Sequence, residues 1–331
     1  MKISVFNIRE EEKNIFEAFK KAHPQVELVG FSEGLTLDNL DKVSGSDSVS
    51  LSTVDKVEDE LLEELNKMGI KVISQRSAGF DMYNLEKLDE LGMKLINVPR
   101  YSPNAIGEYA ASVALYFTRN LDRIFANSKK KDFRWVPAIL SKEMRTMTVG
   151  IVGTGNIGRA CGKLFKGLGA KLIGYDPYES DEAKKILDYV SLEELYQRAD
   201  VISYHLPATK DNYHMVDDKA IAMMKDGVVL INAARGSILD TKAVLRGLDS
   251  GKIRGCGLDV YEEEFDVIKK DLSGEDLGDE VLEEILSRDD IIYTPHIAFY
   301  TETALDNLMT YPLDQSIKFL ESGDADSVVN R

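Results

Sequence analysis

The sequence has few cysteines and a deficit of basic residues. Only two cysteines, Cys161 and Cys256, occur in 331 residues, and neither belongs to a Cys-x-x-Cys pair or a Cys/His spacing typical of zinc. This pattern excludes a disulfide framework and a structural zinc site, so we expect two small buried side chains and no bound metal. The formal net charge of −16 lacks the basic footprint that nucleic acids and anionic membranes require.

Long apolar runs are also absent. No stretch approaches the roughly 20 apolar residues that span a bilayer, and residues 2–6 form a strand-like opening rather than a signal peptide. We therefore expect a cytoplasmic protein that binds neither nucleic acid nor membrane. A content of 44% hydrophobic and 30% charged residues is ordinary for globular proteins, and the length allows two domains.

The first hundred residues alternate short apolar runs with helical spacing of apolar residues. Such a βαβ series is typical of a parallel sheet. Strands are predicted over residues 3–8, 26–31, 47–52, 71–74 and 94–98, and helices over 11–22 and 59–68. A helix rich in small residues is predicted over 104–119, after Ser102 and Pro103, and we interpret it as the bridge between two domains.

A second βαβ series follows and has the strand count of a complete doubly wound dinucleotide-binding domain. Its strands are predicted over residues 148–153, 171–176, 200–206, 227–232, 255–260 and 290–294. The acidic insert 262–279 is expected to be a surface loop or a short helix. An amphipathic helix over 301–320 is expected to return to the first domain and to be followed by a polar tail.

The strongest motif is a glycine-rich turn within residues 148–158. An apolar strand leads into G-x-G-x-x-G at Gly153, Gly155 and Gly158, and a helical pattern follows. The first glycine permits the tight turn, the second lets a pyrophosphate approach, and the third lets helix and strand pack closely. The helix N-terminus then presents N–H groups to the phosphates.

Asp176 ends the next predicted strand, at the position where a carboxylate can accept hydrogen bonds from ribose hydroxyls. Pro177, Tyr178 and Glu179 follow, with no Lys or Arg to neutralise a 2′-phosphate. Because two carboxylates near this site would repel NADP, the sequence predicts NAD as the cofactor. A structural alternative is that Asp176 only begins a turn before the proline.

Four histidines occur, and two of them follow predicted strands of the second series. His205 and His296 end different strands, and the carboxyl ends of parallel strands meet at one edge of the sheet, where ligands bind. We therefore expect His296 to face the nicotinamide although it is remote in sequence. His23 and His214 lie in polar segments and are interpreted as structural.

Charged side chains follow two more of these strands. Arg235 ends one apolar strand, and its planar guanidinium matches a substrate carboxylate. The alternative is a salt bridge to one of the glutamates in the run 262–264, which follows Asp259. Composition cannot distinguish these three glutamates; in an extended segment Glu262 and Glu264 share a face. A carboxylate beside His296 would favour its protonated form and make it a competent acid.

At these residues the chain resembles the D-isomer-specific 2-hydroxyacid dehydrogenases over essentially its full length, and within that family the bacterial D-lactate dehydrogenases. The similarity is carried by the segments 152–158, 232–236, 258–264, 294–301, 97–106 and 134–137. It implies an α/β fold of two doubly wound parallel-sheet domains. A Rossmann NAD-binding domain, residues 102–297, would be inserted in a flavodoxin-like substrate domain, residues 1–101 and 298–331. The resemblance also implies a homodimer built through the cofactor domain, in keeping with the small-residue helix after Pro103.

The resemblance assigns His296 as the acid/base, Glu264 as its partner and Arg235 as the anchor of the substrate carboxylate. Substrate contacts are implied for the backbone of Ala78 and Gly79 and for Tyr101 and Phe299, with Ser52 at the side-chain pocket. Asp259 is expected near the nicotinamide carboxamide. The full set of expected cofactor contacts is Gly153, Gly155, Asn156, Ile157, Gly158, Asp176, His205, Pro207, Asn212, Ala233, Ala234 and Asp259.

Two departures from the family pattern concern the substrate. Arg76-Ser-Ala-Gly79 replaces the usual Arg-Asn-Val-Gly but keeps the glycine. Ser52 stands where the lactate enzymes carry a tyrosine and branched-chain relatives a leucine, although Trp135 and Phe299 keep the lactate pattern. The predicted function is reduction of a 2-keto acid, pyruvate first, to the D-2-hydroxy acid with NADH and the reverse. The alternatives are bulkier branched or aromatic substrates and, more remotely, an NAD-sensing homologue without turnover.

Overall fold

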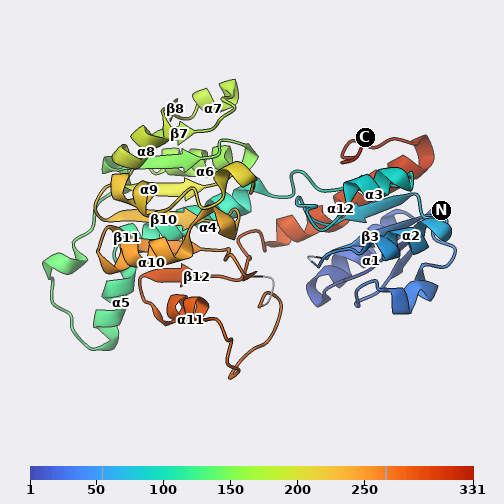
Figure 1. The fold of residues 1–331 in the computed structure, drawn as a ribbon, viewed down its shortest axis with the longest axis horizontal. Coiled ribbons are helices and arrows are strands. Elements are labelled where there is room, and N and C mark those ends of the chain that lie inside the picture. Colours follow the sequence, from blue (N-terminus) through green and yellow to red (C-terminus); the bar gives the residue numbers. More distant parts are fainter. Residues whose placement is uncertain (54, 265–266) are drawn as a thin grey trace. The chain divides into compact units, whose positions relative to one another are not determined.

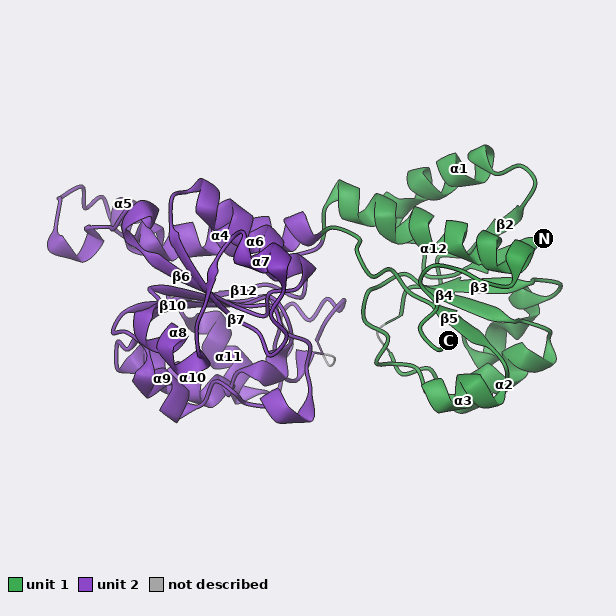
Figure 2. Cartoon of the chain, turned by 90° about the horizontal axis from the view of Figure 1, so that it is seen from above, with its two compact units in different colours: residues 1–102, 300–331 green, residues 103–299 purple. Residues whose placement is uncertain are grey.

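The structure, a computed structural model, describes residues 1–53, 55–264 and 267–331 (Figure 1). The chain divides into two compact units (Figure 2). Unit 1 comprises Met1–Ser102 and Tyr300–Arg331, and unit 2 comprises Pro103–Phe299. None of the helices in these described ranges combines the length and apolar character needed to cross a membrane.

Unit 1 contains a five-stranded parallel sheet with the strand order β2-β1-β3-β4-β5. This is the flavodoxin-like doubly wound order, and it confirms the predicted fold. All five predicted strands of this half are present. Their bounds are β1 Lys2–Val5, β2 Glu27–Gly30, β3 Ser48–Leu51, β4 Val72–Gln75 and β5 Lys94–Ile96.

Helices cover both faces of this sheet, because its buried strands present apolar side chains to either side. Helix α1 (Lys13–Ala22) and the long helix α12 (Glu302–Ser322) pack on one face, where Phe16, Met309 and Leu313 join one apolar cluster. Helices α2 (Asp59–Lys67) and α3 (Leu85–Glu90) cover the other face.

The C-terminal tail is more ordered than its polar sequence predicts. Val328 bridges β5 in antiparallel fashion, and the amide of Val329 donates to the carbonyl of Leu95 at 2.8 Å. The side chain of Asn330 accepts from the Leu95 amide and donates to the carbonyl of Met93. The tail therefore covers the backbone groups of an edge strand, a long-range pairing that local composition does not reveal.

Unit 2 contains a seven-stranded parallel sheet with the order β12-β11-β10-β9-β6-β7-β8. Strand direction and order match the dinucleotide-binding topology, with the switch point between β6 and β9. The six predicted strands are present, and β8 is an additional two-residue edge strand that the sequence did not indicate. The bounds are β6 Thr148–Val152, β7 Lys171–Tyr175, β8 Asp188–Tyr189, β9 Val201–Tyr204, β10 Val228–Asn232, β11 Ile253–Leu258 and β12 Ile291–Tyr293.

Two helical layers enclose this sheet (Figure 2). The layer on one face is built by α4 (Pro103–Thr118) and α6 (Asn156–Gly167), and α5 (Leu121–Lys129) follows α4. The opposite layer contains α8 (Leu192–Arg198), α9 (Asp218–Met223), α10 (Thr241–Asp249) and α11 (Glu280–Ser287). The short helix α7 spans Asp181–Lys184.

The small residues of α4 are used for packing inside unit 2. A Cβ on Gly107 would lie 3.0 Å from the backbone nitrogen of Cys161 in α6, so glycine lets the two helices approach closely. Phe117 of the same helix packs directly over Gly255 of β11. The small residues of α4 therefore serve close packing within unit 2.

The acidic insert forms no α-helix or strand in the described parts of 262–279; Phe265 and Asp266 lie outside the described residues. Cys161 and Cys256 are both buried and unpaired by a disulfide, as the sequence predicted. Burial raises the pKa of the Cys161 thiol to about 12, so it remains a neutral core side chain.

Candidate active site

The carboxyl ends of six strands in unit 2 are aligned in one row. Pairing joins Tyr175 to Val152, Val152 to Tyr204, Tyr204 to Asn232, Asn232 to Leu258 and Leu258 to Tyr293. The segments that follow these residues carry all the predicted cofactor and catalytic side chains of this unit. Register alone therefore brings positions from 153 to 296 to one edge of the sheet, the edge at which open α/β sheets bind ligands.

The glycine turn has the geometry that a bound pyrophosphate requires. Gly153 has a φ of +90°, and a Cβ there would lie 2.7 Å from the carbonyl carbon of His205. A Cβ on Gly158 would lie 1.9 Å from the carbonyl oxygen of Gly153, so the helix can approach the strand only with glycine. By contrast, a Cβ on Gly155 would meet no atom of the described residues within 4 Å and would project into open space before the helix N-terminus. These residues fit a dinucleotide phosphate approaching α6.

Asn156 and Ile157 open helix α6 and are both partly exposed. The Asn156 side chain accepts a hydrogen bond from Arg159, whose other guanidinium nitrogen donates to the carbonyl of Thr154. Arg159 therefore fixes the first turn of the helix. The motif did not predict this contribution, because it specifies only glycine spacing.

Asp176 lies at the end of β7 and contacts the glycine turn. One carboxylate oxygen accepts the Thr154 amide at 2.7 Å, and the other accepts the Tyr178 amide at 2.9 Å. The Thr154 hydroxyl also bonds Tyr189 of β8 at 2.6 Å. The turn role that we considered for Asp176 is thus real, and it coexists with a position at the ligand edge. Tyr189 was missed because its strand is too short to give a periodic pattern.

His205 follows β9 and is a neutral side chain. Its Nε2 bonds the Ser203 hydroxyl at 2.9 Å, while Nδ1 is buried and has no hydrogen-bond partner among the described residues. Burial lowers the pKa of His205 to about 4. In the loop that follows, the side-chain amide of Asn212 donates to the backbone carbonyl of Pro207 at 2.7 Å and closes the loop on itself.

Arg235 follows β10 after Ala233 and Ala234. The Asn232 side chain donates to the carbonyl of Arg235 at 2.8 Å and accepts from the Ala234 amide at 3.1 Å, which sets the course of the backbone as it leaves the strand. The next residue, Gly236, packs so closely on the backbone of residues 261–262 that a Cβ there would lie 2.3 Å from a carbonyl carbon. The turn that presents Arg235 therefore lies against the segment that carries the glutamates.

The structure brings His296 and Glu264 into direct contact. Nδ1 of His296 lies 2.9 Å from Oε1 of Glu264, and the side chains are 35% and 8% exposed. The other carboxylate oxygen accepts the Tyr261 amide at 3.2 Å. His296 has a φ of +56°, a left-handed conformation that costs a non-glycine residue about 1 kcal/mol or more and that recurs at functional sites.

The three glutamates of the run 262–264 have different surroundings. The chain turns there instead of running extended, so the alternation of faces that an extended segment would give does not apply. Glu262 bonds His214 at 2.5 Å and the Thr241 hydroxyl at 2.7 Å, whereas Glu263 is exposed. Glu264 alone of these three bonds His296.

Asp259 organises the loop that carries His296. It is 1% exposed, and its carboxylate accepts the Thr294 hydroxyl at 2.6 Å and the amides of Ile297 and Ala298 at 2.8 and 2.9 Å. Its backbone carbonyl accepts the His296 amide at 2.7 Å. Burial raises the pKa of Asp259. The sequence predicted a contact with the cofactor here but not this positioning role, because the pairing depends on the register of β11 with β12.

The predicted substrate residues of unit 1 follow strands β3, β4 and β5 of its own sheet. Ser52 follows β3 directly, and Ala78 and Gly79 lie in the loop after β4. The Asn97 side chain donates to the carbonyl of Ala78 at 2.8 Å. Tyr101 is half-buried, and its carbonyl accepts from Asn307 of α12 at 2.6 Å.

Phe299 of unit 2 completes the predicted substrate set, and Trp135 accompanies it in the family pattern. Phe299 is half-buried and ends unit 2, three residues after His296. Trp135, which matches the family pattern, is 98% exposed and lies in the segment after α5.

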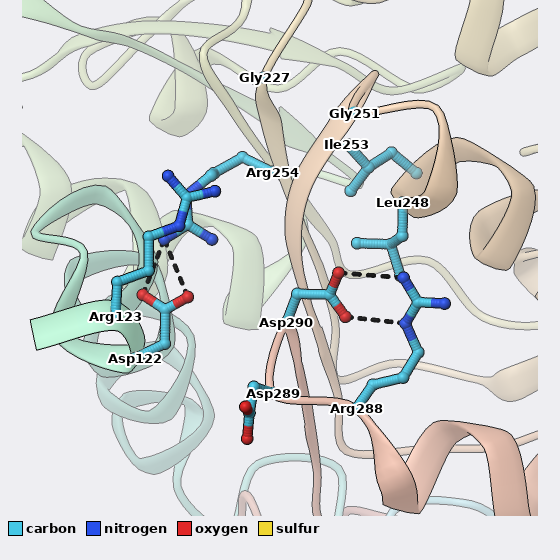
Figure 3. A pocket seen from close by; sticks show the side chains of 10 residues that line it. All are labelled: Asp122, Arg123, Gly227, Leu248, Gly251, Ile253, Arg254, Arg288, Asp289 and Asp290. Atoms are coloured by element: carbon cyan, nitrogen blue, oxygen red, sulfur yellow. Dashed lines mark hydrogen bonds and ion pairs between the residues drawn. The ribbon is translucent and has the colours of Figure 1, made fainter. Parts of the chain in front are cut away.

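A pocket of about 440 Å³ lies at the opposite, amino edge of the unit 2 sheet (Figure 3). It is lined by residues just before or at the start of β10, β11 and β12, among them Gly227, Ile253 and Asp290. Arg288 forms a two-pronged pair with Asp290 at 2.8 and 3.0 Å. This pocket is separate from the ligand edge, and two of its arginines, Arg254 and Arg288, pair with the pocket carboxylates Asp122 and Asp290.

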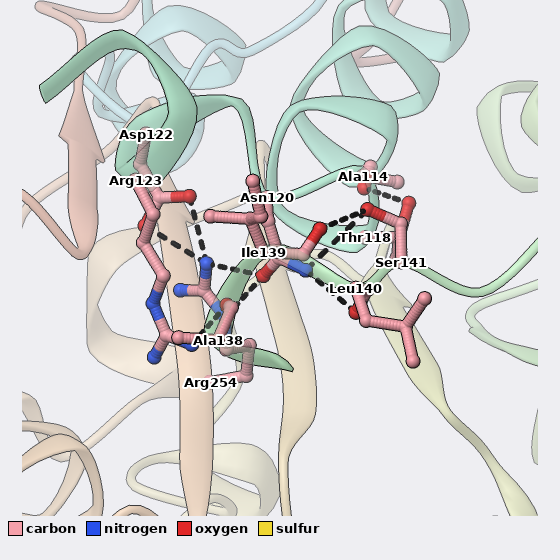
Figure 4. Close-up of polar contacts among 10 residues, drawn as sticks. All are labelled: Ala114, Thr118, Asn120, Asp122, Arg123, Ala138, Ile139, Leu140, Ser141 and Arg254. Atoms are coloured by element: carbon pink, nitrogen blue, oxygen red, sulfur yellow. Dashed lines mark hydrogen bonds and ion pairs between the residues drawn. The ribbon is translucent and has the colours of Figure 1, made fainter. Parts of the chain in front are cut away.

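A buried ion pair in the wall of this pocket holds the segment after α4 (Figure 4). Arg254 of β11 bonds Asp122 at 2.7 Å and the side-chain oxygen of Asn120 at 2.8 Å. Asn120, with a φ of +52°, donates in turn to the carbonyl of Leu140 at 3.1 Å. Helix α5 and residue 140 are thereby tied to the sheet.

Comparison with known proteins agrees with this geometry. The family model described as "D-isomer specific 2-hydroxyacid dehydrogenase, NAD binding domain" matches residues 111–298. A D-lactate dehydrogenase of Treponema pallidum is 48% identical over 314 residues, 95% of each chain. Among solved structures, a D-lactate dehydrogenase from Treponema pallidum superposes with a TM-score of 0.94 at 46% identity over 99% of each chain. The structure of a D-2-hydroxyisocaproate dehydrogenase gives 0.93 at 35% identity over 100% of each chain.

The relatives cover 95% or more of the chain, and the family model that matches residues 111–298 is that of an NAD-binding domain, which confirms the predicted cofactor and fold. The chain therefore belongs to the D-isomer-specific 2-hydroxyacid dehydrogenases, NAD-dependent oxidoreductases, as its motifs predicted.

Proposed function

We propose that this enzyme interconverts pyruvate and D-lactate with NAD. The observation that carries the proposal is the His296–Glu264 contact at the edge where Arg235 also emerges, in a chain whose full-length relatives are named D-lactate dehydrogenases. An imidazole that can give a proton and a guanidinium that can hold a carboxylate are the two groups that reduction of a 2-keto acid requires.

The residues divide the chemistry among them as follows. Arg235, with the backbone of Ala78 and Gly79, binds the substrate carboxylate and orients C2. Glu264 holds Nδ1 of His296, so that Nε2 is the nitrogen that protonates the carbonyl oxygen during reduction and removes the proton during oxidation. Bound NADH supplies the hydride in one direction, and NAD accepts it in the other.

The cofactor would be held by residues after β6, β7, β9 and β10. The pyrophosphate would bind at the glycine turn (Gly153, Gly155 and Gly158) and the N-terminus of α6. The carboxylate of Asp176 would accept hydrogen bonds from the ribose hydroxyls. Residues of the loops after β9 and β10, including Pro207, Asn212, Ala233 and Ala234, complete the predicted contacts. Unit 1 with Ser52 and Tyr101 is proposed as the substrate domain, and unit 2 as the NAD-binding domain.

A panel of keto acids tests the proposal. Oxidation of NADH is followed by absorbance with pyruvate, 2-ketoisocaproate and phenylpyruvate, and the chirality of the product is determined. We expect the highest kcat/KM for pyruvate and a D product. Loss of at least about a hundredfold in kcat/KM is expected for His296→Ala and for Arg235→Ala. Near-normal turnover of either variant would remove that residue from its proposed role.

The same panel decides between substrate classes. Ser52 lies at the position where a smaller side chain leaves a larger pocket, and one structural relative is a D-2-hydroxyisocaproate dehydrogenase. A higher kcat/KM for 2-ketoisocaproate or phenylpyruvate than for pyruvate would establish the bulkier substrate class. Absence of NADH oxidation with every keto acid would favour a nucleotide sensor.

We also propose a homodimer formed through unit 2, located in the cytoplasm. Support for the dimer comes from the segment after α4, where Phe125, Phe133, Trp135 and Leu140 are exposed while the Arg254 network holds the backbone. Apolar side chains on a fixed surface are typical of interfaces. Light scattering should give twice the chain mass, and Leu140→Asp should reduce it; a monomeric wild type would contradict the dimer. Cell fractionation tests the location.

A further inference from the structure

The two predicted substrate segments of unit 1 are joined by one buried side chain, that of Gln75. Gln75 is the last residue of β4 and is 1% exposed. Its amide nitrogen donates to the carbonyl of Thr53 at 2.9 Å and to the hydroxyl of Ser77 at 3.0 Å. Thr53 adjoins Ser52 of the side-chain pocket, and Ser77 adjoins Ala78 of the carboxylate-binding loop.

The orientation of the Gln75 amide is set by Tyr83. The Tyr83 hydroxyl donates to the amide oxygen of Gln75 at 2.8 Å. Burial raises the pKa of Tyr83, so the hydroxyl keeps its proton and remains a donor. With its oxygen bonded in this way, Gln75 directs both amide hydrogens at the two segments, and every hydrogen-bonding atom of the side chain has a partner.

The Ser77 side of this contact continues into the carboxylate-binding loop. The Ser77 hydroxyl donates to the carbonyl of Gly79 at 2.5 Å, and the Ser77 carbonyl accepts the Val98 amide at 2.9 Å. A displacement of Ser77 is therefore transmitted to Ala78 and Gly79. Among the hydrogen bonds of the described residues, no other buried side chain bonds both the loop that contains Ser77 and the backbone at Thr53.

We propose that Gln75 is a positioning residue that fixes the spacing between the Ser52 pocket and the Ala78–Gly79 backbone, and so selects the keto acid. This inference rests on the proposed function, because it assigns a cause to substrate choice. A keto acid spans both segments with its side chain at one and its carboxylate at the other. Their separation therefore decides how well each side-chain length is accommodated, because a misplacement of about 0.5–1 Å already lowers catalysis.

The test is Gln75→Glu, which keeps the size of the side chain but replaces the double donor by an acceptor. The introduced carboxylate faces the carbonyl of Thr53, so that bond is replaced by repulsion. We expect the KM for pyruvate to rise by about tenfold and the ratio of kcat/KM for 2-ketoisocaproate over pyruvate to change by about threefold or more. The KM for NADH, whose proposed contacts lie in unit 2, should stay unchanged.

A pH series separates positioning from general destabilisation. As the pH falls and the introduced carboxyl group takes up a proton, it regains one donor. The ratio of the KM for pyruvate of Gln75→Glu to that of wild type should then decrease. Loss of packing would not respond to protonation in this way.

Gln315→Glu is the matched control. Gln315 is also a buried glutamine of unit 1. Its side-chain amide donates to the carboxylate of Asp326, near the C-terminus, and accepts from the backbone N–H of the same residue. This variant should lower the unfolding midpoint without changing the KM for pyruvate or the selectivity ratio. If Gln75→Glu does not fold, Ser77→Ala decides, because it removes the bond from Gln75 to Ser77, together with the Ser77–Gly79 bond, and leaves the bond to Thr53 in place; a smaller change in the same direction is expected.

Unchanged KM and selectivity in a folded Gln75→Glu, or in Ser77→Ala where that variant decides, would overturn the proposal. So would an equal loss of kcat/KM for all keto acids that does not vary with pH. A wild-type enzyme without turnover of any keto acid would instead refute the proposed function, and this inference with it.

Discussion

Asp259 is predicted to be the main structural support of the loop that carries His296. The substitution Asp259→Asn keeps the shape of the side chain but replaces one acceptor oxygen by an NH₂ group. The amide oxygen can keep the bonds from Thr294 and Ile297, while the amide nitrogen then faces the N–H of Ala298. Two donors then meet in a site that is 1% exposed.

The expected loss of stability follows from these contacts. Two charge-assisted bonds become neutral ones, at about 1 kcal/mol each, and one buried N–H loses its acceptor, at about 1–3 kcal/mol. The raised pKa of Asp259 shows that burial disfavours its charged form, so relief of that desolvation offsets part of the cost. We therefore expect the free energy of unfolding to fall by about 2–4 kcal/mol.

Urea unfolding of the purified protein measures this change in the free energy of unfolding. The kcat with pyruvate shows whether the loop still holds His296 in place. We expect kcat to fall as well, because His296 loses its fixed backbone. Asp218→Asn serves as the control, since Asp218 pairs with Arg246 on the surface and such pairs contribute little. A free energy of unfolding for Asp259→Asn that equals the control value would refute the support role.

Three further predictions concern the cofactor edge. Gly155→Ala should keep the wild-type unfolding midpoint but weaken NADH binding by about tenfold or more, because its Cβ enters the open space before α6. Gly158→Ala should lower the unfolding midpoint and also weaken NADH binding, because its Cβ would lie 1.9 Å from the carbonyl oxygen of Gly153. Equal stability of the two variants in thermal unfolding would contradict this. His205 remains neutral in the folded state to a pH of about 4, whereas the unfolded chain protonates it below its ordinary value of 6.5. The free energy of unfolding should therefore decrease by up to about 3 kcal/mol as the pH falls from 6.5 to about 4. In His205→Asn the free energy of unfolding should depend less on pH over this range. A variant with the wild-type pH dependence would exclude His205 as the cause. Asp176→Ala should raise kcat/KM with NADPH relative to NADH, and an unchanged ratio in steady-state assays would show that Asp176 does not discriminate.

Much of this fold follows from short-range signals in the sequence. Apolar runs followed by helical spacing predicted eleven of the strands, and strand ends then predicted that His296 and Arg235 share one edge. The glycine turn was predictable because a φ of +90° at Gly153 and the close packing at Gly158 exclude other side chains. These features depend on local geometry or on the rule that parallel strands end at one edge.

Other features depend on contacts between distant residues and were missed or left open. Residue types alone could not separate Glu264 from Glu262, whose partners are His296 and His214. The strand β8 is too short for a periodic signal, and the tail at Asn330 pairs with β5, which is more than two hundred residues away in sequence. Positioning by Asp259 and Gln75 likewise arises from strand register, which a single sequence does not display.

The proposed chemistry requires His296 and Glu264 to act as one unit in proton transfer. A double-mutant cycle tests it most directly: kcat/KM for pyruvate is measured for wild type, His296→Asn, Glu264→Gln and the variant with both changes. Because Glu264 would act only through the imidazole at 2.9 Å, its loss should add little once His296 is replaced, and the double variant should match His296→Asn. A double variant slower by the product of the two single effects would show that the two residues act independently and would contradict their coupling in proton transfer.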